Sequence, residues 1–190
     1  MRNEQPMFLE RIFKPNRTRI AGERLYAAIV AQARAPALYE DLGAPDTPDG
    51  RFEVYTLHVL LVLERLRAAG ADGKAVAQAL FDAYLSGLDH GLRELAVGDL
   101  SVGKTMRRLG EAFYGRGKAL DQAFAALPDR APLESLIRRT VFGGVEPADP
   151  APMAGYVLAA RQSLAAAPAG DLTAGEIAWR TPDLTLRRLP

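Results

Sequence analysis

The sequence predicts an all-α protein, a single-domain helical bundle of about six to seven helices. Apolar residues recur three or four positions apart through nearly every segment, which is the period of an amphipathic α-helix. Glycine and proline gather between these segments, and no stretch alternates cleanly at the period of two that indicates a β-strand. With 190 residues, the chain is long enough for one core of ordinary size.

The first half of the chain contains three predicted helices. The helix over 19–33 must end before Pro36, because the residue before a proline disfavours helical geometry. Residues 51–69 are apolar around most of the helix circumference, which is typical of a central, buried helix that ends at Gly70. The third helix, over 75–95, carries one apolar stripe that is expected to face the core: Ala77, Leu80, Tyr84, Leu88, Leu92 and Leu95.

Ser101 is predicted to cap the next helix, because a serine hydroxyl can accept a hydrogen bond from a free amide of the first turn. We expect Gly115 and Gly117 to loosen the middle of this helix, since glycine lowers helix stability. The apolar residues of the helix keep close to heptad spacing: Val102, Met106, Leu109, Phe113, Leu120, Phe124 and Leu127.

The rest of the chain contains two more predicted helices and a tail. Pro132 fits the first turn of one helix, and Asp149 is expected to cap the other, which reaches Ala166. Thr173 and Glu176 match a small capping box in the tail. These elements divide the chain into three regions: an N-terminal basic amphipathic segment (1–18), a helical domain (19–167) and a C-terminal tail (168–190).

Composition excludes several functional classes. The 24 basic and 23 acidic residues give a net charge of +1, which is no signature of nucleic-acid binding, so we expect no DNA partner. The chain has no cysteine, which excludes disulfides, thiolate-bound zinc and thiol nucleophiles and fits a reducing compartment. The N-terminal residues contain acids and no uninterrupted apolar stretch, unlike a secretory signal. We therefore expect a cytoplasmic protein, with any contact to the inner membrane made from its periphery.

Two segments bear on membrane contact. The longest apolar stretch, over 54–63, is far shorter than the roughly 20 residues that a membrane-spanning helix needs, so we expect it to be buried in the core. Apolar and basic residues between positions 8 and 19 form a short basic amphipathic element. Both contact with an anionic membrane and docking onto the protein's own domain fit this element: Phe8, Leu9, Ile12 and Phe13 with Arg11, Lys14, Arg17 and Arg19.

Residues 98–105 satisfy the phosphate-loop pattern GxxxxGK[ST] in full. A phosphate loop must leave a buried strand and enter a helix, and it needs a second strand that ends in a Walker B aspartate. The sequence offers neither strand, so we interpret these residues as a turn between helices, with Lys104 in an exposed first turn. A nucleotide-binding enzyme that uses Lys104 and Thr105 remains the alternative hypothesis.

The sequence predicts no enzyme, no cofactor and no metal site. His58 lies in an apolar segment and is expected to be buried and hydrogen-bonded, whereas His90 is expected to be exposed. Two histidines without cysteine make a poor metal-ligand set. The chain contains neither GxSxG nor HExxH, so no hydrolytic constellation is apparent.

Charged residues form two predicted surface features. On the helix over 75–95, Asp82, Asp89 and Arg93 are seven and four positions apart, so they belong to one polar stripe. This stripe fits either a solvated surface with an Asp89–Arg93 ion pair or a contact for basic loops of a partner. Residues 101–118 carry five basic residues and one acidic residue, a local net charge of +4 that fits anionic lipid, ribosomal RNA or an acidic partner.

Three blocks of residues carry a resemblance to a known family. The first comprises APALY (35–39), PDTPDGRF (45–52) and LH (57–58); the second comprises LFD (80–82), LD (88–89), LRE (92–94) and VGDLSVGK (97–104); the third is EAFYGR (111–116). In order and spacing, these blocks resemble the ubiquinol–cytochrome c chaperones over roughly residues 20–165.

The resemblance implies a non-catalytic assembly chaperone for the cytochrome bc1 complex, which is ubiquinol–cytochrome c reductase. Such a protein holds newly made cytochrome b until haem and partner subunits are in place. Mitochondrial members act with a small helical partner protein and near the ribosome exit, so both are candidate partners. We expect the short bacterial form, without the long import extension of the mitochondrial members. A generic helical adaptor at the membrane surface is the alternative from a different class.

We expect a composite partner-binding surface in which four segments of the bundle meet, among them a turn at 50–52. Phe113 belongs to the core stripe, whereas Tyr114 and Arg116 are expected to point outward as contact residues. The predicted partner-binding residues are Arg51, Phe52, Asp82, Asp89, Arg93, Glu94, Asp99, Lys104, Tyr114 and Arg116.

Overall fold

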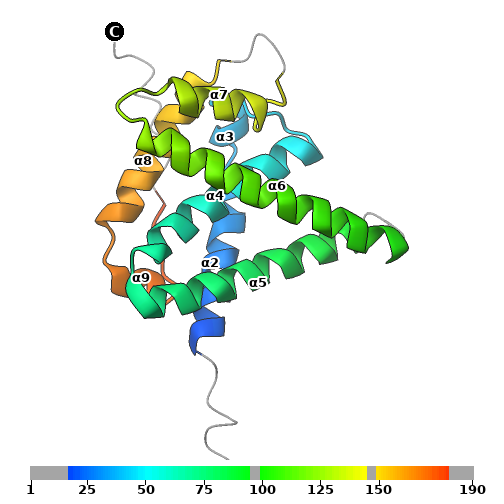
Figure 1. The fold of residues 1–190 in the computed structure, drawn as a ribbon, viewed down its shortest axis with the longest axis vertical. Coiled ribbons are helices and arrows are strands. Elements are labelled where there is room, and N and C mark those ends of the chain that lie inside the picture. Colours follow the sequence, from blue (N-terminus) through cyan, green and yellow to red (C-terminus); the bar gives the residue numbers. More distant parts are fainter. Residues whose placement is uncertain (1–16, 95–98, 145–148, 180–190) are drawn as a thin grey trace, which may run out of the picture.

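The computed structural model describes residues 17–94, 99–144 and 149–179, and within these ranges the protein forms helices and no strand. The prediction of an all-α, single-domain fold is confirmed (Figure 1). Six helices have nine residues or more, and α3 and α9 have four and five. The helices are α2 (Arg17–Ala33), α3 (Ala37–Glu40), α4 (Pro48–Arg67), α5 (Gly70–Glu94), α6 (Asp99–Ala125), α7 (Ala131–Arg139), α8 (Ala151–Ala166) and α9 (Ala169–Thr173).

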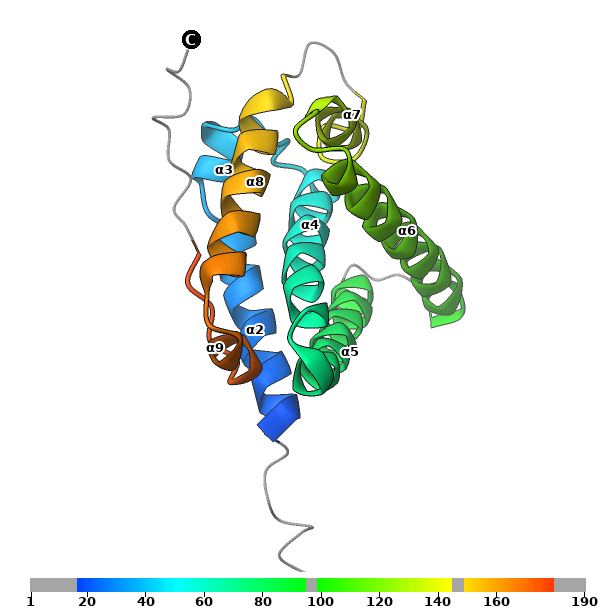
Figure 2. The same ribbon diagram turned by 60° about the vertical axis from the view of Figure 1, so that its left-hand side comes forward.

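α4 is the central helix of the domain. In Figure 2 it lies between α2 and α8 on one side and α5 and α6 on the other. Ten of its residues are buried, including every residue from Thr56 to Val62. The prediction of a helix wrapped by others is therefore confirmed. No helix in the described ranges combines the length and the apolar character that crossing a membrane requires.

α4 begins earlier than predicted, at Pro48. The Thr47 hydroxyl accepts a hydrogen bond from the Gly50 amide at 3.1 Å, and the proline occupies the first turn. Glycine is needed at position 50, because an added Cβ would lie 2.1 Å from the carbonyl oxygen of Pro45. The predicted turn at 50–52 is wrong, since these residues form the first turn of the central helix.

α2 packs closely along α5. Gly22 of α2 is buried, and an added Cβ there would lie 2.6 Å from the backbone carbonyl carbon of Ala79. Gly70 adopts a φ of +73°, which lets the chain pass directly from α4 into α5. The predicted end of the central helix before Gly70 is confirmed, and α5 begins there instead of at residue 75.

α5 and α6 form a hairpin whose far end projects from the body of the molecule (Figure 1). The predicted N-cap at Ser101 is wrong, because α6 already begins at Asp99. The helix also continues without a break to Ala125 through both central glycines, so the predicted loosening is not seen. Buried Phe113 and Leu120 hold the helix against the body on either side of these glycines.

Carboxylates precede the helices α7 and α8. Asp129 Oδ1 accepts a hydrogen bond from the Ala131 amide at 3.0 Å, and Asp149 Oδ1 accepts one from the Ala151 amide at 3.0 Å. Both predictions for this region are therefore confirmed: Asp149 caps α8, and Pro132 lies in the first turn of α7.

Residues 168–179 pack onto the helical domain. Leu172 of α9 is buried, and Gly175 adopts a φ of +85° where an added Cβ would lie 2.8 Å from the Ala21 Cα of α2. The predicted capping box is wrong, because Thr173 is the last residue of α9 and its hydroxyl donates to the Gly170 carbonyl at 3.0 Å.

The predicted N-terminal segment over 1–18 lies outside the described residues, apart from Arg17 and Thr18. These two residues form the beginning of α2.

His58 is fully buried in α4, as predicted. Its Nδ1–H donates to the Val54 carbonyl at 2.7 Å, because a carbonyl can only accept. The Tyr156 hydroxyl donates to His58 Nε2 at 2.6 Å and accepts from Gln32 Nε2 at 3.0 Å. Trp179 closes the site, with its ring edge-on to the imidazole at 5.2 Å between centroids. Burial lowers the pKa of His58 to about 4, so the ring is neutral at physiological pH.

Candidate functional site

The phosphate-loop match does not form a phosphate loop. Residues 99–105 lie in the first two turns of α6, and the preceding described element is the helix α5 instead of a strand. Lys104 is an exposed helix residue. The geometry that would place backbone amides around a phosphate is absent from this part of the chain, so the nucleotide-binding alternative is contradicted.

Each histidine contacts other residues of the fold, and in the described part of the chain neither lies in a cluster of possible catalytic groups. His58 is used within the core network, and His90 is exposed and lies 3.3 Å from Glu94. Among the described residues, no group of three or more histidine, aspartate or glutamate side chains is placed to hold a metal ion.

An aromatic cluster joins α5 to α6. Tyr84 of α5 lies 5.1 Å from Phe113 of α6, and Phe81 of α5 lies 5.2 Å from Phe113, between ring centroids. The Tyr84 hydroxyl is hydrogen-bonded to Thr56 of α4 at 3.1 Å, and burial raises the pKa of Tyr84 to about 12. The cluster therefore belongs to the core at its inner end.

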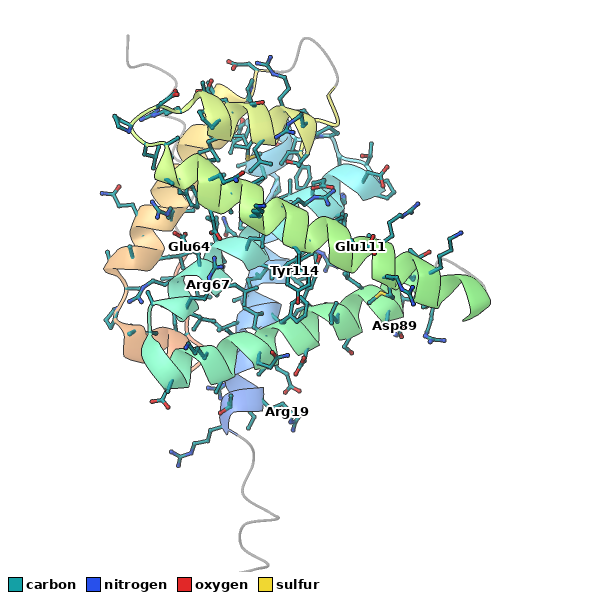
Figure 3. All side chains as sticks on the ribbon, viewed as in Figure 1. Arg19, Glu64, Arg67, Asp89, Glu111 and Tyr114 are labelled. Atoms are coloured by element: carbon teal, nitrogen blue, oxygen red, sulfur yellow. The ribbon has the colours of Figure 1, made fainter. Side chains whose placement is uncertain are left out.

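Tyr114 is the outer end of this cluster. Its ring lies 6.2 Å from Phe81 and 6.0 Å from Phe113, yet 68% of the residue is exposed. No other large hydrophobic residue in the described ranges is exposed in this way. Figure 3 shows Tyr114 on α6 beside α5, between the two arms of the hairpin. An exposed tyrosine on a rigid aromatic base has the properties of an interface anchor.

Apolar side chains remain half-buried along both arms of the hairpin. Their spacing of three or four positions on α5 places them in a single row. On α6, Met106 and Leu109 are three positions apart, and Tyr114 lies five positions further along. We call these residues together with the exposed tyrosine the hairpin surface: Phe81, Leu85, Leu88 and Leu92 of α5, and Met106, Leu109 and Tyr114 of α6.

Arg116 fixes the body end of the hairpin to α4. Its Nε donates to Glu53 Oε2 at 2.6 Å, and its Nη2 makes a second short contact with Oε1 of the same carboxylate. Both side chains are largely buried, and the guanidinium lies 5.9 Å from the centre of the Phe52 ring. The prediction that Arg116 points outward is wrong, because this bidentate pair directs it toward α4.

Arg51 is exposed and makes its contacts with residues near the start of α4. It forms an ion pair with Asp46 and lies 5.6 Å from the centre of the Tyr39 ring. The hydrogen bond from Arg51 holds the pKa of the Asp46 carboxyl below its usual value. These contacts join the start of α4 to the preceding connector and α3.

The polar stripe of α5 is present as predicted, and it divides into two parts. Asp89 accepts a hydrogen bond from Arg93 Nε at 2.8 Å, and this bond lowers the pKa of the Asp89 carboxyl. Asp82 accepts from Gln78 Nε2 at 2.8 Å. In Figure 3, Asp89 lies toward the far end of the hairpin. Asp82 instead lines a groove of about 690 Å³ between α2 and α5, together with Arg19 and Glu23 of α2.

The structure therefore brings together only some of the predicted partner-binding residues. Phe52 and Arg116 meet beside the aromatic cluster that carries Tyr114. Another group lies on the outer part of the hairpin: Asp89, Arg93 and Glu94 of α5 and Lys104 of α6. Asp99 belongs to the first turn of α6, and its side chain lies outside the described ones. Arg51 lies at the start of α4, where it pairs with Asp46.

The sequence interpretation missed two parts of this arrangement. Leu88 and Leu92 were predicted as part of the core stripe, but both are only half-buried. With Phe81 and Leu85 they form a row whose spacing of three or four positions was visible in the sequence. Glu53, the partner of Arg116, lies 63 positions away in the sequence. No spacing within one helix could have indicated that pair.

Comparison with known proteins agrees with the fold and the residue blocks. A model of the ubiquinol-cytochrome C chaperone family matches residues 40–179. A solved structure described as the Cbp3 homolog from Brucella abortus superposes with a TM-score of 0.80 at 32% sequence identity, covering 93% of this chain and 96% of the other.

A curated relative matches over a shorter stretch. The chain is 25% identical over 96 residues to ubiquinol-cytochrome-c reductase complex assembly factor 1 of Xenopus laevis. That match covers 50% of this chain, and it spans about half the length of the relative, 48%. The family is one of chaperones and not of enzymes. The chain belongs to the ubiquinol–cytochrome c chaperone family.

Proposed function

We propose that this protein is a non-catalytic assembly chaperone for the cytochrome bc1 complex, and that it holds newly made cytochrome b on the hairpin surface. Membership of the chaperone family and the name of the Xenopus laevis relative support the assembly role. The single observation that carries the choice of surface is Tyr114, which is exposed although its ring lies beside the buried Phe113 and the half-buried Phe81.

The chemistry of the hairpin surface suits a membrane-protein client. Helices of such a client expose apolar side chains before assembly, and these can pack against the half-buried row formed by Leu85, Leu88 and Leu92. The polar loops that flank client helices need charged partners. Asp89 lies on the α5 side of the surface and Lys104 on the α6 side, so both signs of charge are available.

The predicted contact residues separate accordingly. We keep Phe52, Asp89, Arg93, Glu94, Asp99, Lys104 and Tyr114 in the proposed client surface, and leave out Asp82, which lines the groove between α2 and α5. Arg51 and Arg116 act by holding α4 in position, through their contacts with Asp46 and Glu53. A client that is a membrane protein places the chaperone at the cytoplasmic side of the inner membrane.

The decisive experiment is a pull-down from detergent-solubilised membranes of a strain in which bc1 assembly is blocked. The tagged wild-type protein is expected to recover cytochrome b. Tyr114→Ala should weaken this recovery about 30-fold, the equivalent of about 2 kcal/mol for a central interface aromatic. Gln122→Ala, an exposed change on the same helix, is the matched control and should recover cytochrome b as the wild type does.

Each outcome bears on a different part of the proposal. Recovery of other membrane proteins without cytochrome b would indicate a generic helical adaptor instead of a dedicated chaperone. Wild-type recovery that Tyr114→Ala leaves unchanged would place the client elsewhere on the molecule. A deletion strain with a normal content of bc1 complex would exclude the assembly role.

A further inference from the structure

The outer face of α6 carries a row of four cations, of which the proposed client surface uses only Lys104. Lys104, Arg108 and Lys118 are spaced by four and ten positions, and Arg107 lies next to them on the same side of the helix. All four side chains are exposed. At 1.5 Å per residue, the row extends over about 21 Å along the helix axis.

In the part of the chain that the structure describes, no acidic side chain pairs with these cations. Among the described residues, Glu111 is the one acid on this face. Four other arginines, by contrast, are paired: Arg51 with Asp46, Arg67 with Asp121, Arg116 with Glu53 and Arg161 with Glu64. The predicted local charge of +4 thus becomes a net +3 on one helix face, since Arg116 turns inward and four cations remain against one acid.

The position of this face at the edge of the molecule allows it to contact a flat surface. Figure 2 shows α6 at the edge of the molecule, with α4 and α5 on its inner side. The opposite side of α6 is the one that packs inward, through Phe113, Leu120 and Phe124. The cations therefore project from a continuous convex helix, and every one of them can reach a flat surface at the same time.

We propose that the outer face of α6 binds the anionic phospholipid headgroups of a membrane. Headgroups move laterally in a bilayer, so they can match a row of cations that has no preformed pocket. Each basic residue near such a surface contributes about 1 kcal/mol, which gives four of them a reversible attachment. An RNA partner is less well matched, because the whole chain has a net charge of only +1 and attracts a polyanion weakly at long range.

This lipid contact rests on the proposed function, to which it adds a way of bringing the hairpin surface close to a client in the membrane. Tyr114 lies at the margin of the cationic face, one turn beyond Glu111 (Figure 3). With the cations on the headgroups, the hairpin surface stands beside the bilayer. A client helix then meets Tyr114 and Phe81 as it leaves the lipid.

The test is flotation of the purified full-length protein with vesicles. Vesicles of phosphatidylcholine that contain phosphatidylglycerol are expected to carry the protein, and vesicles of pure phosphatidylcholine are not. Raising the sodium chloride concentration should release it. The double variant Arg107→Gln with Arg108→Gln should lower the partition coefficient about 30-fold, at about 1 kcal/mol for each residue.

The matched control is Arg24→Gln with Lys74→Gln. These two residues are exposed cations of α2 and α5, and the control changes the net charge by the same amount. It should leave the partition coefficient unchanged. Equal losses in both double variants would mean that only total charge matters and would overturn the assignment of the face.

Two further results would also overturn it. One is a wild-type protein that fails to float with the anionic vesicles. The other is a protein that shifts single-stranded RNA in a mobility assay and does not bind the vesicles. The vesicles contain no protein, and the pull-down for the proposed function contains no bilayer, so failure of the lipid contact and failure of client binding are separate results.

Discussion

The domain around α4 and the α5–α6 hairpin are both helical, but they differ in how completely their apolar and polar side chains are buried and paired. Around α4, every residue from Thr56 to Val62 is buried, and the polar groups of His58 and Tyr156 are paired with each other. Along the hairpin, leucines remain half-buried and Tyr114 is exposed, and no acid among the described residues pairs with the cations on the outer face of α6. In the first region the side chains contact one another within the fold, whereas the second exposes apolar and charged side chains that other molecules can contact.

The first prediction compares the loss of stability when a leucine is truncated in each of the two regions. Leu61 of α4 is 1% exposed, so Leu61→Ala leaves a cavity and should lower the free energy of unfolding by about 3 kcal/mol. Leu92→Ala in the half-buried row should cost only about 1 kcal/mol. Urea unfolding followed by circular dichroism measures both. Equal losses would show that the hairpin is as much a part of the core as α4.

The second prediction uses acid to open the core. The folded-state pKa of His58, about 4, lies below the value of about 6.5 expected in the unfolded chain. The unfolded state therefore binds a proton first as the pH falls, and stability is lost between pH 6.5 and 4. At pH 5 the loss should be about 2 kcal/mol relative to pH 8.

A variant isolates the histidine from other acid effects. His58→Gln removes the titrating group, so the difference in unfolding free energy between pH 8 and pH 5 should shrink by that amount. A variant that retains the full pH dependence would assign the loss to other groups.

The third prediction compares two ion pairs that join the same two helices. Arg116 and Glu53 are largely buried, whereas Arg67 and Asp121 are more than half exposed on average. Arg116→Ala should therefore cost about 1 to 2 kcal/mol, because it leaves the Glu53 carboxylate poorly hydrated. Arg67→Ala should cost less than about 0.5 kcal/mol. Thermal unfolding of the two variants measures the contrast, and the reverse order would refute the role given to Arg116.

The parts of the fold that follow from local periodicity could be predicted. Residues 51–69 are apolar around the circumference, and that pattern identified the central helix. The heptad-like row on α6 identified Phe113 and Leu120 as core residues. Both signals arise from burial on one helix, so they need no knowledge of the neighbouring helices.

The candidate site was harder to predict, because it depends on contacts between distant segments. Tyr114 was correctly expected to be exposed, since it follows the core position Phe113. The same argument failed for Arg116, whose direction is set by Glu53 on another helix. The capping-box prediction at Thr173 failed for a related reason: the close approach of Gly175 to Ala21 of α2 governs the chain there.

The indole of Trp179 separates the imidazole of His58 from the solvent side of the fold. Withdrawal of residues 174–179 would hydrate that imidazole and move its affinity for protons back toward that of a free histidine. By thermodynamic reciprocity, protonation of the ring would in turn favour withdrawal of the segment. Protonation of His58 and detachment of residues 174–179 are thus coupled, so a fall in pH favours exposure of this part of the core to water.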